Sequence, residues 1–311
     1  MAPMRIVVMG SGGTGGYFGA KLARAGEDVT FVARGRHLAA IRAGGMRVKS
    51  GVEGEWTVRA TAVDRLDGAA PADLVLFCVK SFDTEEAAAL VRPVVGSDTG
   101  VLSIQNGVDN EEKLERALGP GHVLGGAARV FATIEAPGVI SHTFGGHVTF
   151  GEMDGRETER ARRFLAACQK ASIPAELVRD VNRALWEKYV FLTTHAGMTA
   201  LTRCPAGVLR SIPEVREVYR RLLTELLAIA RAVGVTLGDG LLDLKFLDGV
   251  APNASSSLHH DLTHGKRLEL DALHGRAVRL AERHGVPAPT LFAVYAGLRP
   301  YRDGAPAVPA G

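Results

Sequence analysis

The chain is poor in cysteine and has no marked excess of one charge. Its three cysteines, Cys78, Cys168 and Cys204, are widely spaced and odd in number. They form neither a disulfide framework nor a zinc-binding spacing, which favours a reducing cytoplasm. The 37 basic and 34 acidic residues give a net charge of +3 without clusters, so the sequence offers no electrostatic footprint for nucleic acid.

Long hydrophobic runs are also missing. No apolar stretch reaches the length that spans a membrane, so no membrane partner is expected. The N-terminus leads straight into an expected strand, so no signal peptide is expected either. At 311 residues, the chain is long enough for two domains with a core in each.

Glycine, in contrast, is abundant, and its most informative cluster lies near the N-terminus. An apolar run at 6–9, expected to be a buried strand, leads into a G-x-G-x-x-G frame and then into a helical pattern. In this frame the three glycines permit a tight turn, the approach of a pyrophosphate and close packing of helix on sheet. The frame predicts a dinucleotide site, with a purely structural glycine turn as the alternative. The predicted site comprises Gly10, Ser11, Gly12, Gly13, Thr14 and Gly15.

The end of the next expected strand, at 29–32, indicates which dinucleotide binds. NAD-binding units usually carry Asp or Glu there to accept hydrogen bonds from the ribose. This sequence has Ala33 and Arg34 instead. An arginine attracts the 2′-phosphate that an acidic residue would repel, so NADPH is the predicted cofactor. The alternative is that Arg34 belongs to a solvated basic turn.

Strand and helix patterns then alternate to about residue 178. Expected strands at 74–79 and 101–104 end beside Lys80 and Asn106. In an open parallel sheet, ligands bind outside the carboxyl ends of the strands, so both side chains are expected near the cofactor. Farther along, alternating residues around Gly145-Gly146 predict a hairpin.

From residue 180 onward the patterns are helical. The predicted fold is therefore α/β, with an N-terminal Rossmann-type, doubly wound, mostly parallel sheet followed by an all-helical C-terminal domain. The expected boundaries are 1–178 for the NADPH-binding domain and 179–302 for a helical domain that binds substrate and dimerises. The tail at 303–311, rich in Pro, Ala and Gly, is expected to be disordered.

The first expected helix of the second domain, at 182–202, carries a candidate acid. Lys188 interrupts an apolar neighbourhood and shares one helical face with Leu192, His195 and Thr199. A dinucleotide domain supplies the hydride, so the second domain must supply an acid or base. From periodicity alone, a surface lysine that snorkels is the better explanation of Lys188.

These pieces together resemble the ketopantoate reductase (2-dehydropantoate 2-reductase) family, from about residue 4 to 299. No single motif is specific, but their order is. The motifs are the glycine frame, Val79-Lys80, Gln105-Asn106-Gly107, Leu185-Trp186-Glu187-Lys188, Thr199-Ala200-Leu201, Cys204-Pro205-Ala206-Gly207, Ser255-Ser256-Ser257 with Asp261, and Glu269-Leu270-Asp271.

The resemblance implies NADPH-dependent reduction of a 2-oxo acid to a 2-hydroxy acid, ketopantoate to pantoate in pantothenate biosynthesis. It also implies a homodimer through the helical domain. By similarity, Arg34 and Lys80 hold the adenosine phosphate end of NADPH. A 2-oxo acid needs a proton donor beside its ketone and hydrogen-bond donors around its carboxylate, so the residue types fit this chemistry.

The remaining roles also follow from the resemblance. Lys188 would be the general acid that protonates the carbonyl oxygen. Asn106 would lie near the ribose and nicotinamide and touch substrate. Ser257 would bind the substrate carboxylate, and Glu269 would lie near the cofactor and the reacting centre.

The sequence departs from the family where asparagines commonly follow the lysine by four and eight residues. It has Leu192 and Ala196 there, so hydrogen bonds to the hydroxyl of ketopantoate are missing unless Thr193, Thr194 or His195 replaces them. A polar group left unpaired costs roughly 1 to 3 kcal/mol. The hypothesis is therefore a reductase with a more apolar 2-oxo acid substrate, and the alternative from another class is a non-enzymatic NADPH-binding sensor.

Other residues are weaker candidates. His260 and His264, at i and i+4, could bind a metal on a helix, but no third ligand is evident and no metal site is predicted. His195 is expected to be a packed histidine rather than a second acid. Cys78 is expected to be a small core residue.

Overall fold

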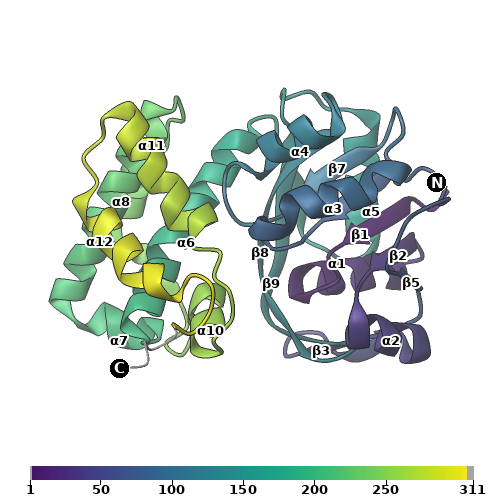
Figure 1. Ribbon diagram of the computed structural model, residues 1–311, viewed down its shortest axis with the longest axis horizontal. Coiled ribbons are helices and arrows are strands. Elements are labelled where there is room, and N and C mark those ends of the chain that lie inside the picture. The colour runs from purple at the N-terminus through teal and green to yellow at the C-terminus, as the bar shows by residue number, and fades with distance from the viewer. Residues whose placement is uncertain (1, 307–311) are drawn as a thin grey trace. The chain divides into compact units, whose positions relative to one another are not determined.

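The computed structural model describes residues 2–306, which form two compact units (Figure 1). The first unit comprises the described residues up to Gln105 and Asp109–Ala184. The second comprises Asn106–Val108 and the described residues from Leu185 onward. The predicted domain boundaries stay a prediction. The tail at 303–311 that is expected to be disordered includes residues 307–311, which lie outside the described residues.

The first unit is built on one ten-stranded sheet in the order β4-β3-β9-β8-β7-β6-β1-β2-β5, with β10 paired to β9. Only β3–β4 and β8–β9 pair antiparallel among the described strands. The predicted class, a mostly parallel doubly wound sheet followed by helices, is confirmed. The elements are β1 (Arg5–Met9), α1 (Gly13–Arg24), β2 (Asp28–Val32), α2 (Gly35–Gly44), β3 (Met46–Ser50), β4 (Gly54–Val58), β5 (Thr61–Val63), β6 (Leu74–Phe77), η1 (Ser81–Asp83), α3 (Thr84–Val91), η2 (Arg92–Val94), β7 (Gly100–Ser103), α4 (Asn110–Leu118), β8 (Val123–Ala136), β9 (Val139–Glu152), α5 (Glu159–Lys170) and β10 (Ala175–Leu177).

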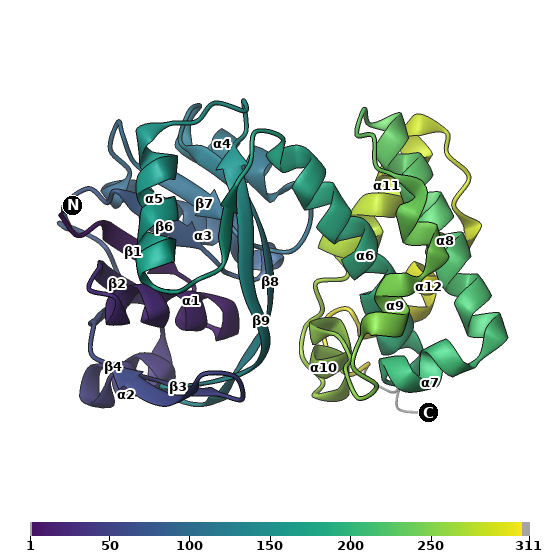
Figure 2. The same cartoon turned by 180° about the vertical axis from the view of Figure 1, so that it is seen from behind.

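Both faces of the central strands of this sheet are buried, as their apolar runs require. Along β1, Ile6 and Val8 join a core with α1 and α5, while Val7 and Met9 join a second core with α3 and α4. Figure 1 shows α3 and α4 over one face, and Figure 2 shows α5 on the other. The alternation of side chains along a strand thus explains why the sheet is wound on two sides.

The hairpin predicted around Gly145-Gly146 is wrong. The reversal between β8 and β9 lies at Pro137-Gly138, and both glycines lie inside β9 with φ of 78° and 116°. The pairing of β8 with β9 shifts register beside them, between Arg129 and Val130. Glycine in a strand serves a bulge as well as a turn, and here it bends one long strand.

The second unit is helical and has its own apolar core. Helix α6 begins in the first unit and continues through the second, where Tyr189 and Val190 pack with residues of α8 such as Leu222 and Leu226. After Leu270 the chain forms a π-helical turn that continues into an α-helix. The elements are α6 (Val181–Thr202), α7 (Ala206–Ser211), α8 (Pro213–Ala232), η3 (Asp239–Asp243), α9 (Lys245–Gly249), α10 (Ser257–Thr263), η4 (Asp271–Gly275), α11 (Arg276–His284), α12 (Pro289–Leu298) and η5 (Arg299–Tyr301).

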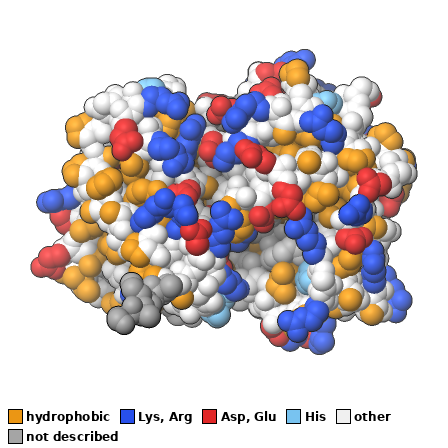
Figure 3. Space-filling view, in the orientation of Figure 1, with side chains coloured by type: hydrophobic (Ala, Val, Ile, Leu, Met, Phe, Trp, Pro, Cys, Tyr) orange, Lys and Arg blue, Asp and Glu red, His pale blue; other side chains and the backbone are white. Residues whose placement is uncertain are grey.

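The surface of the molecule mixes both charges. Figure 3 shows Lys and Arg side chains interspersed with Asp and Glu over the visible face. Among the helices that the structure describes, none is both long and apolar enough to cross a membrane.

Candidate functional site

The glycine frame forms the start of α1, directly after β1. Gly12 is the N-cap, in extended backbone, and it has no side chain with which to cap the helix. The first turn, Gly13-Thr14-Gly15, carries no carboxylate. The helix therefore offers backbone N–H donors and the positive end of its dipole to an anion.

The packing around Gly10, Gly12 and Gly13 differs sharply. A Cβ built on Gly10, where φ is 94°, would lie 2.7 Å from the backbone nitrogen of Val79. A Cβ on Gly13 would lie 1.9 Å from the carbonyl oxygen of Ala132 in β8. At Gly12, in contrast, no described atom lies within 4 Å of such a Cβ. Space is thus open at the one glycine beside which a pyrophosphate must pass, so these residues fit a dinucleotide.

A histidine that sequence reasoning missed holds this turn in place. His37 Nε2 lies 2.8 Å from the carbonyl oxygen of Ser11, and the N–H of Gly138 donates to His37 Nδ1 at 3.0 Å. Because Nδ1 accepts, Nε2 is the ring nitrogen that donates to Ser11. The Ser11 hydroxyl donates to the carbonyl oxygen of Val32 at 2.9 Å and is buried. The backbone N–H of Ser11 also donates to this oxygen, at 3.3 Å, so the polar groups of Ser11 are all engaged within the turn.

The two predicted cations lie at the expected ends of strands. Arg34 follows β2, is exposed, and donates from Nη2 to Glu86 Oε1 at 2.7 Å. Lys80 follows β6 and is half-buried at the start of η1. The sequence did not indicate a role for Glu86, because the helical pattern around Glu86 does not show that its carboxylate pairs with Arg34. A 2′-phosphate at Arg34 would have to compete with this carboxylate, but exposed ion pairs contribute only about 0 to 1 kcal/mol.

Two of the predicted residues from distant parts of the chain meet. Asn106 Nδ2 donates to Glu269 Oε2 at 3.4 Å. Asn106 is half-buried after β7, and Glu269 is only 5% exposed just before the π-helical turn. The pairing joins an amide to a buried carboxylate, which is a means of fixing the orientation of both side chains.

Lys188 and Ser257 lie on helices that are hydrogen-bonded together. Lys188 is half-buried on α6, and Ser257 is the first residue of α10 and also half-buried. Ser256 caps α10 by accepting from the N–H of His259, and its hydroxyl lies 2.8 Å from Thr199 Oγ1 on α6. The start of α10 is therefore anchored to the helix that carries Lys188.

His195, on the same face of α6, is a packed side chain. It is 5% exposed, its Nδ1 lies 3.1 Å from the hydroxyl of Tyr219, and its ring stacks on Phe191. Burial lowers the pKa of His195 to about 4, so it is neutral at neutral pH. This environment agrees with the packed role that the sequence favoured.

The two positions that depart from the family pattern have different environments. Leu192 is half-buried and packs against the core of the helical unit. Ala196 is 1% exposed and belongs to that core. Only the first position is therefore accessible to a ligand, and an asparagine at the second would have to displace core atoms.

The other histidines and cysteines show no metal-binding arrangement. The rings of His260 and His264 stack with centroids 4.1 Å apart, and His264 Nδ1 bonds to the carbonyl of His260 at 2.7 Å. In the described part of the chain, no three His, Cys, Asp or Glu side chains are grouped so that they could hold a metal ion. Cys78 directly follows β6, and burial raises the pKa of its thiol.

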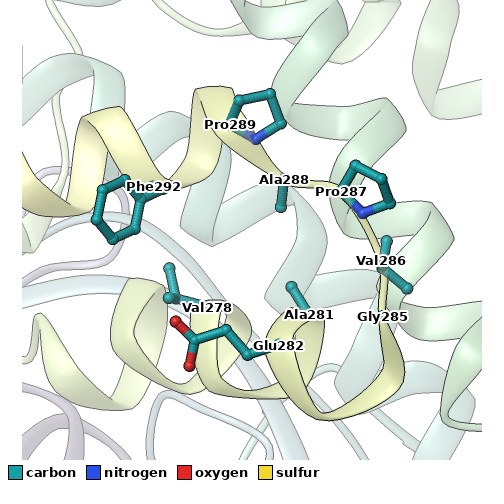
Figure 4. A pocket seen from close by; sticks show the side chains of 9 residues that line it. All are labelled: Val278, Ala281, Glu282, Gly285, Val286, Pro287, Ala288, Pro289 and Phe292. Atoms are coloured by element: carbon teal, nitrogen blue, oxygen red, sulfur yellow. The ribbon is translucent and has the colours of Figure 1, made fainter.

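A separate apolar groove of about 470 Å³ lies between α11 and α12 (Figure 4). Its walls include Val278, Val286 and Phe292, with the Glu282 carboxylate among them. It shares no residue with the predicted site. It therefore adds nothing to the chemistry described above.

Comparisons with known families cover almost the whole chain. The family model described as "Ketopantoate reductase PanE/ApbA" matches residues 6–155. The model described as "Ketopantoate reductase PanE/ApbA C terminal" matches residues 180–302.

Individual proteins give the same picture. The chain is 34% identical to a 2-dehydropantoate 2-reductase of Halobacterium salinarum, over 93% of this chain and 95% of the relative. It is 28% identical to an uncharacterized oxidoreductase, YkpB, of Bacillus subtilis, over 96% and 99% of the two chains. A crystal structure of a PanE/ApbA family ketopantoate reductase from Ralstonia eutropha aligns with a TM-score of 0.88 at 34% identity, covering 96% of this chain and 98% of that one. A D-mandelate dehydrogenase with NADH and anilino(oxo)acetate shares the fold, with a TM-score of 0.89 at 18% identity, over 96% and 98% of the chains.

Proposed function

Because this chain belongs to the ketopantoate reductase family, as its ordered motifs predicted, we propose that it reduces a 2-oxo acid to a 2-hydroxy acid with NADPH. The observation that carries the proposal is the pairing of Asn106 with the buried Glu269. The family resemblance assigns both residues to the reacting centre, and the fold brings them together from positions 163 residues apart.

The proposed cofactor site uses backbone and charge. The open approach at Gly12 and the start of α1 receive the pyrophosphate, while Arg34 and Lys80 bind the adenosine phosphate end. When bound, NADPH supplies the hydride that adds to C2 of the substrate. The choice of NADPH over NADH rests on Arg34, which stands where an acidic residue would bind the ribose of NAD.

The proposed chemistry of the substrate uses three side chains of the helical unit. The ammonium of Lys188 donates a proton from Nζ to the carbonyl oxygen, so that no alkoxide accumulates. The hydroxyl of Ser257 donates a hydrogen bond to the carboxylate and fixes the orientation of the acid. Glu269 holds Asn106, whose amide is then positioned for the substrate and the ribose.

The first candidate substrate is 2-dehydropantoate, the acid named for several relatives, and its reduction yields pantoate for pantothenate biosynthesis. The alternative substrate is a more apolar 2-oxo acid, which Leu192 favours. A cytoplasmic location and a homodimer formed through the helical unit belong to the same proposal. A non-enzymatic NADPH sensor is the second candidate function, favoured by Leu192 and Ala196, which stand where the family commonly has asparagines.

The test is NADPH consumption with a panel of 2-oxo acids, comparing the parent with Lys188→Ala. We expect the variant to lose turnover by about 10² to 10⁴ fold, since that is the usual contribution of a general acid, while its affinity for NADPH is unchanged. Lys266→Ala, an exposed lysine of the same unit, is the matched control and should retain activity. A parent that binds NADPH but consumes none with any acid would establish the sensor instead. A Lys188→Ala variant with parental turnover would remove Lys188 as the acid.

A further inference from the structure

The face of α6 that follows Lys188 is apolar and aromatic. Phe191, Leu192 and His195 lie three, four and seven residues after Lys188, so all four share one stripe of the helix. Phe191 and Leu192 are half-buried, as Lys188 is, whereas His195 is buried. A ligand that reaches the Lys188 ammonium would therefore lie against the carbon surfaces of residues 191 and 192.

An aromatic side chain from another element extends this surface. Phe246 of α9 meets Phe191 edge to face, with ring centroids 4.9 Å apart and an interplanar angle of 88°. Phe191 also stacks on His195, with ring centroids 5.8 Å apart and an interplanar angle of 7°. Phe191, Leu192 and Phe246 together form one surface. The core of the helical unit holds this surface in place, because Leu192 and Phe246 both pack against that core. We call these three residues the apolar patch.

The polar side chains that could have replaced the family asparagines point elsewhere. Thr194 is fully buried and donates to the carbonyl of Val190 at 2.9 Å. Thr193 is 1% exposed, so its hydroxyl is out of reach of a ligand. His195 has its Nδ1 bonded to Tyr219 and is buried. A hydroxyl on the substrate would thus meet hydrocarbon at the apolar patch and lose its hydrogen bonds to water.

We propose that the substrate of this chain is a 2-oxo acid with a bulky, branched or aromatic side chain that carries no hydroxyl, and that the apolar patch receives this side chain. The inference rests on the proposed function, since it concerns the specificity of the same reaction. Apolar surfaces discriminate by roughly 10 to 200 fold per missing or added methylene, so a strong preference for the bulkier acids follows.

The sharpest substrate pair differs by one hydroxyl. 3,3-Dimethyl-2-oxobutanoate is 2-dehydropantoate without its hydroxyl, and phenylpyruvate adds an aromatic side chain. With saturating NADPH, we expect kcat/KM for the deoxy acid to exceed that for 2-dehydropantoate by about tenfold or more, because only the hydroxylated acid leaves a polar group unpaired. We expect phenylpyruvate to be reduced as well.

Two variants test whether the apolar patch is responsible. Leu192→Asn restores an amide at the accessible position and should shift the ratio of the two kcat/KM values toward 2-dehydropantoate by about tenfold. Leu201→Asn, the same substitution at an exposed site of α6, should leave that ratio unchanged. Phe191→Ala should lower kcat/KM for phenylpyruvate more than for pyruvate, and thermal unfolding verifies that each variant is folded.

The outcomes separate this inference from the function on which it depends. If no 2-oxo acid is reduced, the proposed function fails. If 2-dehydropantoate is reduced in preference to its deoxy analogue, the reductase stands and the inference is overturned. The inference is also overturned if Leu192→Asn and Leu201→Asn change the ratio of kcat/KM values equally.

Discussion

The glycine-rich start of α1 and the helix face of α6 that carries Lys188 are formed by different parts of the chain. The first is made of backbone, and its key positions are a few residues apart in sequence. The second depends on side chains whose partners, Tyr219 and Phe246, come from other helices. Backbone geometry follows from local sequence, whereas the polarity of a side-chain surface depends on which members of the stripe the tertiary fold buries. A cofactor turn is therefore easier to infer from sequence than a substrate preference.

The helical unit contains two buried histidines with lowered pKa values, and acid should destabilise this unit. In the helical unit, burial lowers the pKa of His195 and of His274 from 6.5 to about 4. Above pH 6.5 both histidines are neutral in the folded and in the unfolded protein, so they cost no stability. As the pH falls from 6.5 to 4, the unfolded chain binds protons that the folded unit refuses, so stability is lost. The linkage amounts to roughly 2 kcal/mol per histidine by about pH 5 and about 3 kcal/mol by about pH 4.

The two tryptophans allow this loss to be measured unit by unit. Trp56 lies in the first unit and Trp186 in the second, so Trp186→Phe and Trp56→Phe leave one reporter each. Urea unfolding followed by fluorescence should show a larger drop between about pH 7 and pH 5 for Trp186 than for Trp56. His274→Leu should reduce that drop, since the buried imidazole would no longer gain a proton on unfolding. Equal drops at both reporters would contradict the contrast.

The backbone turn can be probed by two alanines at adjacent positions. Gly13→Ala should destabilise the first unit by about 1 to 3 kcal/mol, because its Cβ would overlap the carbonyl oxygen of Ala132. Gly12→Ala has open space and an extended backbone, so stability should change by less than about 0.5 kcal/mol. Its methyl group would instead obstruct the pyrophosphate, weakening NADPH binding by about tenfold, or about 1.4 kcal/mol.

Urea unfolding at Trp56 and calorimetric titration with NADPH measure the two effects separately. If Gly12→Ala binds NADPH as the parent does, the open space at this glycine does not receive the cofactor. The pair therefore distinguishes a glycine required by packing from a glycine required by a ligand, which the G-x-G-x-x-G frame cannot do by itself.

The sequence predicted the elements whose pattern of apolar residues and glycines is local. The strand and helix around the glycine frame agree with β1 and α1. It failed at Gly145-Gly146, because a glycine pair is compatible with both a turn and a bulge, and only the pairing partner decides. Helices α4 and α7 were missed; α4 is largely polar, and α7 spans only six residues.

Within the candidate site, too, the sequence predicted features that depend on local patterns and missed those that depend on tertiary contacts. The positions of Lys80 and Asn106 after their strands followed from apolar runs. The partner of His195 and the role of His37 did not, because they depend on residues 24 and 26 positions away. The pairing of Asn106 with Glu269 likewise became visible only in the fold.

The smallest expected effect lies at Arg34, the side chain that is proposed to select NADPH. Glu86 pairs with Arg34 and would compete with a 2′-phosphate. Glu86→Gln should therefore tighten NADPH binding by a factor of up to about five, the equivalent of an exposed ion pair of at most about 1 kcal/mol, and leave NADH unchanged. Glu85→Gln, the exposed neighbour on α3, makes the same change of charge and is the control. Titrations at low and high salt should show the gain shrinking as screening increases. Equal tightening of NADPH and NADH would mean that Arg34 does not contact the 2′-phosphate, and cofactor choice would then have to reside in the backbone turn.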